Sequence, residues 1–203
     1  SATQAHSPAT GVASAEANNV AVIARQAIVD AHRAVFGYEL FDRSTTSHEH
    51  TAATDAALLF NALSSAGSNA IGGRKMVFIN CTHESLAGGH LELINPEKVV
   101  LEVPALDPNA TPDDIEYRLT ALLGLNKRGF RIALDQNTLR PAYAQWLAVA
   151  AFIKLDMTAF APEQAKVLVK FARAYSRAQI VAEKVETAEQ HALMADLDVK
   201  LFQ

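Results

Sequence analysis

FRIALDQNTLRPAYAQWLAVAAFIKLD, residues 130–156, contains two short apolar runs, at 130–134 and 152–155, with an amphipathic stretch between them that starts at Pro141. Proline is favoured in the first turn of a helix, so we expect a helix at 141–148. A nearly all-apolar run, a helix and a second such run are typical of a parallel sheet covered by helices. The stretch therefore predicts the α/β class.

The same alternation continues on both sides of this unit. The runs at 20–29 and 34–41 are separated by only a polar Asp-Ala-His-Arg turn, which predicts an antiparallel hairpin. Eight strands in all favour a TIM-like (β/α) barrel with one antiparallel strand, and an open doubly wound sheet is the alternative. The last strand has no helix after it. The other strands are expected at 75–81, 99–103, 179–185 and 199–202, and the other helices at 52–66, 83–94, 112–127, 162–173 and 188–197.

Composition indicates one globular domain at 19–203, preceded by a flexible leader at 1–18 that is rich in Ala, Ser, Thr and Asn. The formal net charge of -4 gives no reason to expect a nucleic-acid polymer or a membrane surface as a partner. No apolar run approaches the roughly 20 residues that cross a bilayer. Cys81 is the only cysteine, which excludes an internal disulfide and fits a cytoplasmic location.

Polar side chains occur in or just beyond the C-terminal half of most predicted strands, although an unpaired buried charge is costly. The C-terminal strand ends of an α/β barrel converge on one rim, so we expect these side chains to share one site. They are Glu39, Asn80, Glu102, Asp135, Lys154, Asp156, Glu183 and Glu186.

Four of these residues are oxygen donors on neighbouring strands and match the ligand types of a hard cation such as Mg²⁺ or Mn²⁺. They are Glu39, Asn80, Glu102 and Asp135. Clustered carboxylates repel one another, and either a metal or Lys154 could relieve that repulsion, so Lys154 is a site residue or a structural counter-ion. Each side chain could instead cap a strand end, and this alternative applies most to Asp156, just before a predicted helix.

Other chemically active side chains are interpreted as structural. Cys81 is expected to be a small buried or strand-end residue, because no neighbouring histidine suggests an activated thiol. His83 is expected on a helix surface, and Trp146 is expected to anchor the core or an interface. His48 and His50 are expected to belong to a solvated loop.

Six segments, taken in order, resemble the EAL domain family of bacterial cyclic di-GMP signalling. The resemblance covers roughly 20–203 and implies a barrel with one antiparallel strand. Lys184 and the FIN strand resemble especially the EAL half of proteins in which an HDOD domain follows the barrel. The segments are GYELFDR at 37–43, FIN at 78–80, VVLEV at 99–103, IALD at 132–135, IKLD at 153–156 and AEKVET at 182–187.

The resemblance implies hydrolysis of cyclic di-GMP to a linear dinucleotide by two metal ions. It assigns the first metal to the four oxygen donors given above. Lys154 and Glu183 would orient or deprotonate the attacking water. Arg43 would contact a ligand phosphate, Glu186 would support the adjacent loop, and Gln203 would close the pocket.

The chain departs from the family pattern after Asp135, where active members have a second Asp and a glycine-containing turn. Here Gln136 is followed by Asn-Thr-Leu-Arg, and a carboxamide is a poorer ligand for a hard cation than a carboxylate. The sequence therefore predicts a degenerate domain that acts as a regulatory, ligand-binding or protein-binding module. An active phosphodiesterase is the alternative. A protein partner or an HDOD domain is expected, and a homodimer is compatible with the resemblance.

Overall fold

The computed structural model describes residues 23–42, 56, 59–64, 67 and 71–203. The predicted leader at 1–18, Arg43 and the histidine pair of the 44–50 loop lie outside the described residues. Of the helix expected at 52–66, residues 56 and 59–64 are described and are helical.

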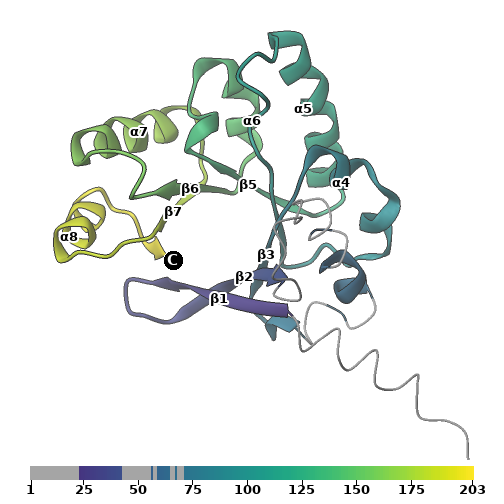
Figure 1. Cartoon of the computed structure of the whole chain (residues 1–203), viewed down its shortest axis with the longest axis horizontal. Coiled ribbons are helices and arrows are strands. Elements are labelled where there is room, and N and C mark those ends of the chain that lie inside the picture. The colour runs from purple at the N-terminus through teal and green to yellow at the C-terminus, as the bar shows by residue number, and fades with distance from the viewer. Residues whose placement is uncertain (1–22, 43–55, 57–58, 65–66, 68–70) are drawn as a thin grey trace, which may run out of the picture.

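Eight strands form a closed barrel in the order of the sequence, which confirms the predicted fold. β1 pairs antiparallel with both of its neighbours, β2 and β8, and all other pairs are parallel. Figure 1 shows the C-terminal end of the chain beside the β1–β2 hairpin, where the barrel closes. The strands are β1 Ile23–Asp30, β2 Val35–Asp42, β3 Met76–Asn80, β4 Val99–Glu102, β5 Arg131–Asp135, β6 Phe152–Asp156, β7 Gln179–Glu183 and β8 Leu201–Phe202.

The helices lie outside the barrel, between consecutive strands (Figure 1). Prolines occupy the first turns of α5 (Pro112–Lys127), the 3-10 turn η3 (Pro141–Tyr143) and α7 (Pro162–Tyr175), as predicted. The main α-helices are α5 Pro112–Lys127, α6 Ala144–Val149, α7 Pro162–Tyr175 and α8 Ala188–Asp196. In the part of the chain that the structure describes, none of the helices is both long enough and apolar enough to cross a bilayer.

Two predicted helices are wrong in detail. The segment 83–94 is not one helix, because α4 (His83–Ala87) ends at Gly88, whose backbone is extended, and a 3-10 turn, η1 (Gly89–Leu93), follows. The segment 141–148 starts as a 3-10 turn, η3 (Pro141–Tyr143), and becomes α-helical only at Ala144.

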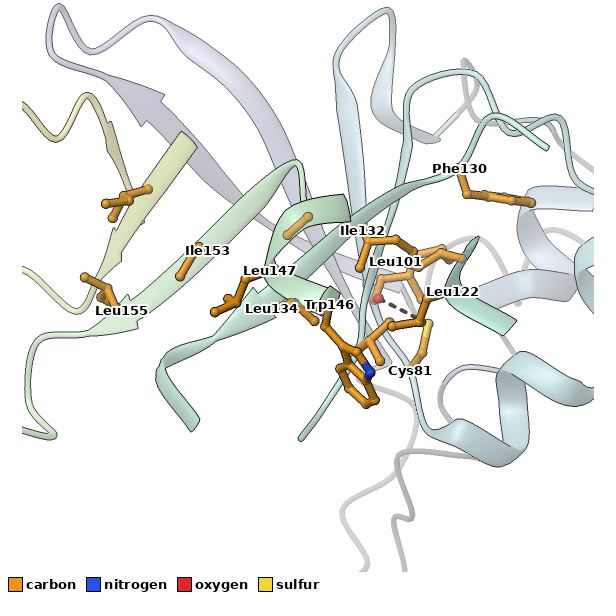
Figure 2. Packing of buried hydrophobic residues seen from close by; sticks show 14 of the residues in the cluster. Cys81, Leu101, Leu122, Phe130, Ile132, Leu134, Trp146, Leu147, Ile153 and Leu155 are labelled. Atoms are coloured by element: carbon orange, nitrogen blue, oxygen red, sulfur yellow. Dashed lines mark hydrogen bonds between the residues drawn. The ribbon is translucent and has the colours of Figure 1, made fainter. Parts of the chain in front are cut away.

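Side chains that point outward from the strands pack against the helices. Trp146 of α6 is fully buried in this layer, near Leu101, Ile132 and Leu134 (Figure 2), and its indole N–H donates to the backbone oxygen of Ile115 at 3.0 Å. The prediction that Trp146 anchors the core is therefore confirmed. This layer ties the helices to the barrel wall, which holds the strand ends in place.

A second, smaller apolar cluster fills the inside of the barrel. Phe78 and Phe152 meet edge to face there, with ring centroids 5.0 Å apart. Because successive side chains of a strand alternate between its two faces, the residue two positions further along each strand faces the same interior. The cluster consists of Ile28, Phe78, Val100, Ala133, Phe152, Val181 and Leu201.

Candidate functional site

A cavity of about 230 Å³ lies at the C-terminal ends of the strands, directly above the interior apolar cluster. The polar residues that line it follow the apolar ones at a spacing of two: Asn80 follows Phe78, and Glu102 follows Val100. We call this space the main cavity. Its polar lining residues are Glu39, Asn80, Glu102, Asp135, Lys154 and Glu183, all six of which were singled out from the sequence.

Lys154 occupies the centre of this group and is only 4% exposed. Its ammonium contacts one carboxylate oxygen of Glu39 and one of Glu102, and it lies 3.2 Å from Glu183 Oε1. It also donates to Gln203 Oε1 at 2.8 Å. Both alternatives that the sequence left open for Lys154 are compatible with this position, since it lines the cavity and pairs three carboxylates.

Charge and burial shift the pKa values of these groups strongly. Burial by itself lowers the pKa of Lys154, but the negative charges of Glu102, Glu39 and Glu183 outweigh it and raise that pKa well above its ordinary value. Burial and a hydrogen bond with Glu39 raise the pKa of Glu102 well above its ordinary value. For Glu39, burial is outweighed by hydrogen bonds from Glu102 and by Lys154, and the pKa falls. Glu102 therefore holds a proton more readily than Glu39 does.

The donor types around the main cavity fit a hard divalent cation, because they are carboxylate and amide oxygens. Glu102 Oε1 is buried and has no hydrogen-bond partner, although it forms the ion pair with Lys154. Among the described residues, no three His, Cys, Asp or Glu side chains converge as in a formed metal site. In this arrangement the Lys154 ammonium lies between the carboxylates that a cation would contact.

Asp135 and Gln136 lie where β5 passes into the 3-10 turn η2 (Gln136–Thr138). Asp135 lines the main cavity, and its Oδ1 accepts from the backbone N–H of Asn137 at 2.8 Å. Burial raises the pKa of Asp135, and the hydrogen bonds from Asn137 oppose that shift. Gln136 does not line the main cavity, and its Oε1 accepts from the backbone N–H of Asp156 at 3.2 Å. The Gln136 amide therefore links η2 to the end of β6.

Of the remaining predicted site residues, Gln203 lies beside the main cavity and Glu186 lies away from it. Gln203 donates to Gln26 Oε1 at 3.1 Å and to Glu39 Oε1 at 3.3 Å, so it joins the closing strands above Lys154. Glu186 is exposed, does not line the main cavity, and borders a different cleft. Gln26 was missed from the sequence, although its alternation with Ile28 in β1 places it on the interior face.

Asp156 does not cap the helix predicted after it, because α7 begins at Pro162 with Ala161 as its N-cap, and it instead caps the turn that follows β6. Its Oδ1 accepts from the backbone N–H of Thr158 at 2.9 Å, and its Oδ2 pairs with Lys184 at 3.0 Å. Hydrogen bonds from Thr158 and Lys184 outweigh burial and lower the pKa of Asp156. Lys184 has a φ of 56°, a conformation that glycine adopts at little cost, and glycine is the residue that the EAL pattern has at this position.

Cys81 and His83, which lie near the site, were both interpreted from the sequence as structural residues. Cys81 is buried, as predicted, and burial raises the pKa of its thiol. His83 is not a simple surface residue, because its Nε2 lies 2.9 Å from the backbone oxygen of Pro104 and its ring packs 5.8 Å from that of Trp146. Its position under the 104–108 loop was not visible in the sequence.

A second space, which we call the side cleft, adjoins the main cavity. It has a volume of about 550 Å³ and shares Pro104 and Asp135 with the main cavity. The rest of its lining comes from two loops, the one after β4 and the one after β5, and consists of Ala105, Leu106, Pro108, Gln136, Asn137 and Arg140. Arg140 was not singled out from the sequence.

Comparison with known proteins places this geometry among similar folds. No protein-family model matches the chain. The chain is 32% identical over 175 residues to the cyclic di-GMP phosphodiesterase CdgJ of Vibrio cholerae. The match takes in 83% of this chain and 39% of CdgJ, so the chain spans about two fifths of the length of that relative.

Solved structures of EAL proteins share the fold. The Bacillus subtilis YkuI protein has an EAL domain and was solved in complex with c-di-GMP and calcium. Its TM-score is 0.65 at 19% identity, over 92% of this chain and 54% of that one. A standalone EAL protein from Vibrio cholerae, bound to c-di-GMP, has a TM-score of 0.66 at 16% identity, over 90% of this chain and 88% of that one. The chain therefore has the barrel fold of EAL-domain proteins and is similar in sequence to part of a cyclic di-GMP phosphodiesterase.

Proposed function

We propose that this chain is a degenerate EAL domain of bacterial cyclic di-GMP signalling, which binds its ligand and acts as a regulatory module with little or no hydrolysis. The observation that carries the proposal is the position of Gln136. The neutral amide replaces a carboxylate of the EAL pattern. Its oxygen accepts a hydrogen bond from the backbone of β6, and the side chain does not line the main cavity. The similarity to CdgJ and the shared fold support the family assignment.

The oxygen donors Glu39, Asn80, Glu102 and Asp135 would hold Mg²⁺ or Mn²⁺ in this proposal. A bound divalent cation supplies positive charge against a ligand phosphate and promotes deprotonation of water. The chain itself contributes Lys154, whose ammonium holds Glu39 and Glu102 together at the base of the cavity. Glu183 lies half-buried at the rim, 3.2 Å from Lys154, where its carboxylate can accept a proton from water.

Loss of the second carboxylate weakens this site for an electrostatic reason. Each anionic ligand lowers the free energy of a bound divalent cation, and an amide contributes only a dipole. Gln136 is also tied to Asp156 N–H, so turning its side chain toward the cavity would break that hydrogen bond. We therefore expect at most one tightly held cation and slow turnover.

An active phosphodiesterase remains the second candidate. It is favoured by the six polar residues that line one cavity and by the similarity to CdgJ, which is named a cyclic di-GMP phosphodiesterase. The two candidates share a ligand and differ only in whether the phosphodiester bond is cleaved.

Production of the linear dinucleotide in the presence of Mg²⁺ or Mn²⁺ distinguishes the two. We expect wild-type protein to give little or no product and Gln136→Asp to give more, because the substitution restores the missing carboxylate. Gln136→Asn is the matched control, since it keeps a neutral amide. Robust turnover by wild-type protein that Glu39→Gln abolishes would overturn the regulatory assignment and support the active enzyme.

The proposal extends to partners and location. A regulatory domain acts through another protein or domain, and we propose an HDOD domain or a separate protein partner in this role. A homodimer and a cytoplasmic location belong to the same proposal. Co-purification of the natural full-length protein with its partners, and its mass in solution, test these points.

A further inference from the structure

The main cavity carries an excess of negative charge. Four acidic side chains line it and only one cation, Lys154, whose ammonium already contacts Glu39, Glu102 and Glu183. Apart from the divalent cation that the proposed function places here, the cavity offers a phosphate no cationic side chain that is free to bind it. A ligand with more than one phosphate therefore gains from an unpaired cationic side chain nearby.

Arg140 is such a group, and it lines the side cleft next door. Its side chain is exposed, and none of the ion pairs formed by the described residues involves it. The guanidinium lies over the ring of Tyr143, with its central carbon 5.1 Å from the ring centroid. Stacking on an aromatic face holds a guanidinium in place while leaving its N–H donors available.

The two walls of the side cleft are joined to the same buried aromatic residue. The Tyr143 hydroxyl accepts from the backbone N–H of Leu106 at 2.9 Å, which ties the loop after β4 to the turn that carries Arg140. Tyr143 is fully buried and meets Trp146 edge to face, with centroids 4.9 Å apart. The walls therefore have a fixed separation before any ligand binds.

The turn that leads to Arg140 is also held by hydrogen bonds. The buried Thr138 donates from Oγ1 to the backbone oxygen of Asp135, and its own backbone oxygen accepts from Arg140 N–H, both at 2.8 Å. The turn has these contacts without the glycines of the EAL pattern. The position of the Arg140 backbone is consequently preorganised, which lowers the entropic cost of binding.

The chemistry of the side cleft suits a nucleotide. One wall is apolar and contains Pro104, Leu106 and Pro108, which offer apolar contact to a base, and the opposite wall offers the Arg140 guanidinium to a phosphate. A volume of about 550 Å³ is within the range of small-molecule sites. The shared residues Pro104 and Asp135 make the side cleft and the main cavity neighbours, so one extended ligand can reach both.

We propose that the side cleft is a nucleotide subsite, in which Arg140 binds a phosphate of the ligand and the 104–108 loop packs against a base. The inference rests on the proposed function in one respect: it takes the natural ligand to be a cyclic dinucleotide. One nucleotide half of that ligand occupies the side cleft, and the other extends over the main cavity.

Calorimetric titration of the purified chain with cyclic di-GMP, 5′-GMP and inorganic phosphate tests the subsite. We expect Arg140→Gln to weaken binding of cyclic di-GMP and 5′-GMP by about tenfold or more, because one charge-assisted phosphate contact is lost. Arg140→Lys keeps the charge but not the planar guanidinium, so its affinities for both ligands should lie between those of wild type and Arg140→Gln. Arg177→Gln is the matched control, since Arg177 is exposed and precedes β7 at the opposite end of the barrel.

The outcomes separate this inference from the proposed function. If cyclic di-GMP binds equally well to wild type, Arg140→Gln and Arg177→Gln, the subsite is wrong while the family ligand stands. If 5′-GMP binds in an Arg140-dependent way and cyclic di-GMP does not bind, the subsite is supported and the proposed ligand is overturned. If neither nucleotide binds, both are overturned. The near-ultraviolet circular dichroism of Trp146, the only tryptophan, verifies that each variant keeps the packing beneath Arg140.

Discussion

The interior of the barrel has two layers that differ completely in chemistry although the same strands supply both. The lower layer is apolar and contains Phe78 and Phe152, and the upper layer is polar and contains Glu39 and Lys154. The layers are two residues apart on each strand, a rise of about 7 Å. They meet where the Lys154 ammonium lies 5.4 Å from the centroid of the Phe78 ring. The comparison shows that one set of strands can carry a stable core and, two residues further along, a polar cavity.

The largest expected effect comes from emptying the lower layer. Phe78→Ala removes a fully buried ring that packs against Phe152 and leaves a cavity inside a closed barrel, where the strands cannot move inward. We expect a loss of about 4 kcal/mol in the free energy of unfolding, measured by urea denaturation. Phe41→Ala, at a side chain that is 39% exposed, should cost much less. Equal losses for the two variants would show that the interior layer does not support the barrel.

Lys154→Met breaks the upper layer. The substitution keeps an apolar stem but leaves Glu39, Glu102 and Glu183 without their shared cation, so we expect a loss of about 3 kcal/mol in the free energy of unfolding. Mn²⁺ should restore part of this stability if the carboxylates can share a metal ion in place of the ammonium. Lys166→Met, at a solvent-exposed ion pair with Glu163, is the matched control and should change stability little. A Lys154 variant as stable as the Lys166 variant would show that the ion pairs contribute nothing.

Gln203→Ala tests how the upper layer is closed at the seam between β8 and β1. The amide accepts from the charged Lys154 and donates to the charged Glu39 and the neutral Gln26, and each such hydrogen bond is worth on the order of 1 kcal/mol in net terms, more for a charged partner. We expect a loss of about 1 to 2 kcal/mol, because water can replace some of these contacts at the rim. A destabilisation as large as that of Lys154→Met would mean that Gln203 positions the whole cluster.

The smallest expected effect lies outside both layers, at His83. Burial lowers the pKa of His83 below its ordinary value of 6.5, and this outweighs the opposing hydrogen bond with Pro104. The unfolded chain therefore binds the proton more readily, and the contribution of His83 to stability is present above pH 6.5 and is lost as the pH falls through the lower folded-state value. Denaturation midpoints of wild type and His83→Gln at several pH values measure the effect. The dependence of the midpoint on pH should become weaker in His83→Gln and stay unchanged in His90→Gln, a substitution at an exposed histidine.

Much of the fold could be predicted because the apolar runs are short and clearly bounded. All eight strands were expected, and α5 occupies the predicted residues, starting at Pro112. The failures occur at helix ends. Glycine has a low helix propensity, and Gly88 and Gly89 end α4 inside the segment predicted as one helix. The segment at Pro141 starts as the 3-10 turn η3 before α6 begins.

The candidate site was predicted in its membership but not in its connections. Glu102 and Lys154 were recognised because charged residues between apolar neighbours need a reason to be buried. The hydrogen bond between the Gln136 side chain and the Asp156 backbone and the one between Gln203 and Gln26 join groups that are far apart in the chain. Sequence patterns contain no direct record of such distances.

The sequence by itself determined which side chains face the interior, because alternation along a strand is a local property of the backbone. It also determined that polar residues follow apolar ones at a spacing of two in β3, β4, β5, β6 and β7. Only the tertiary structure decided that Lys154 reaches three carboxylates on other strands and that the side cleft opens beside them. Closure of the barrel sets these neighbours, and closure depends on the pairing of all eight strands at once.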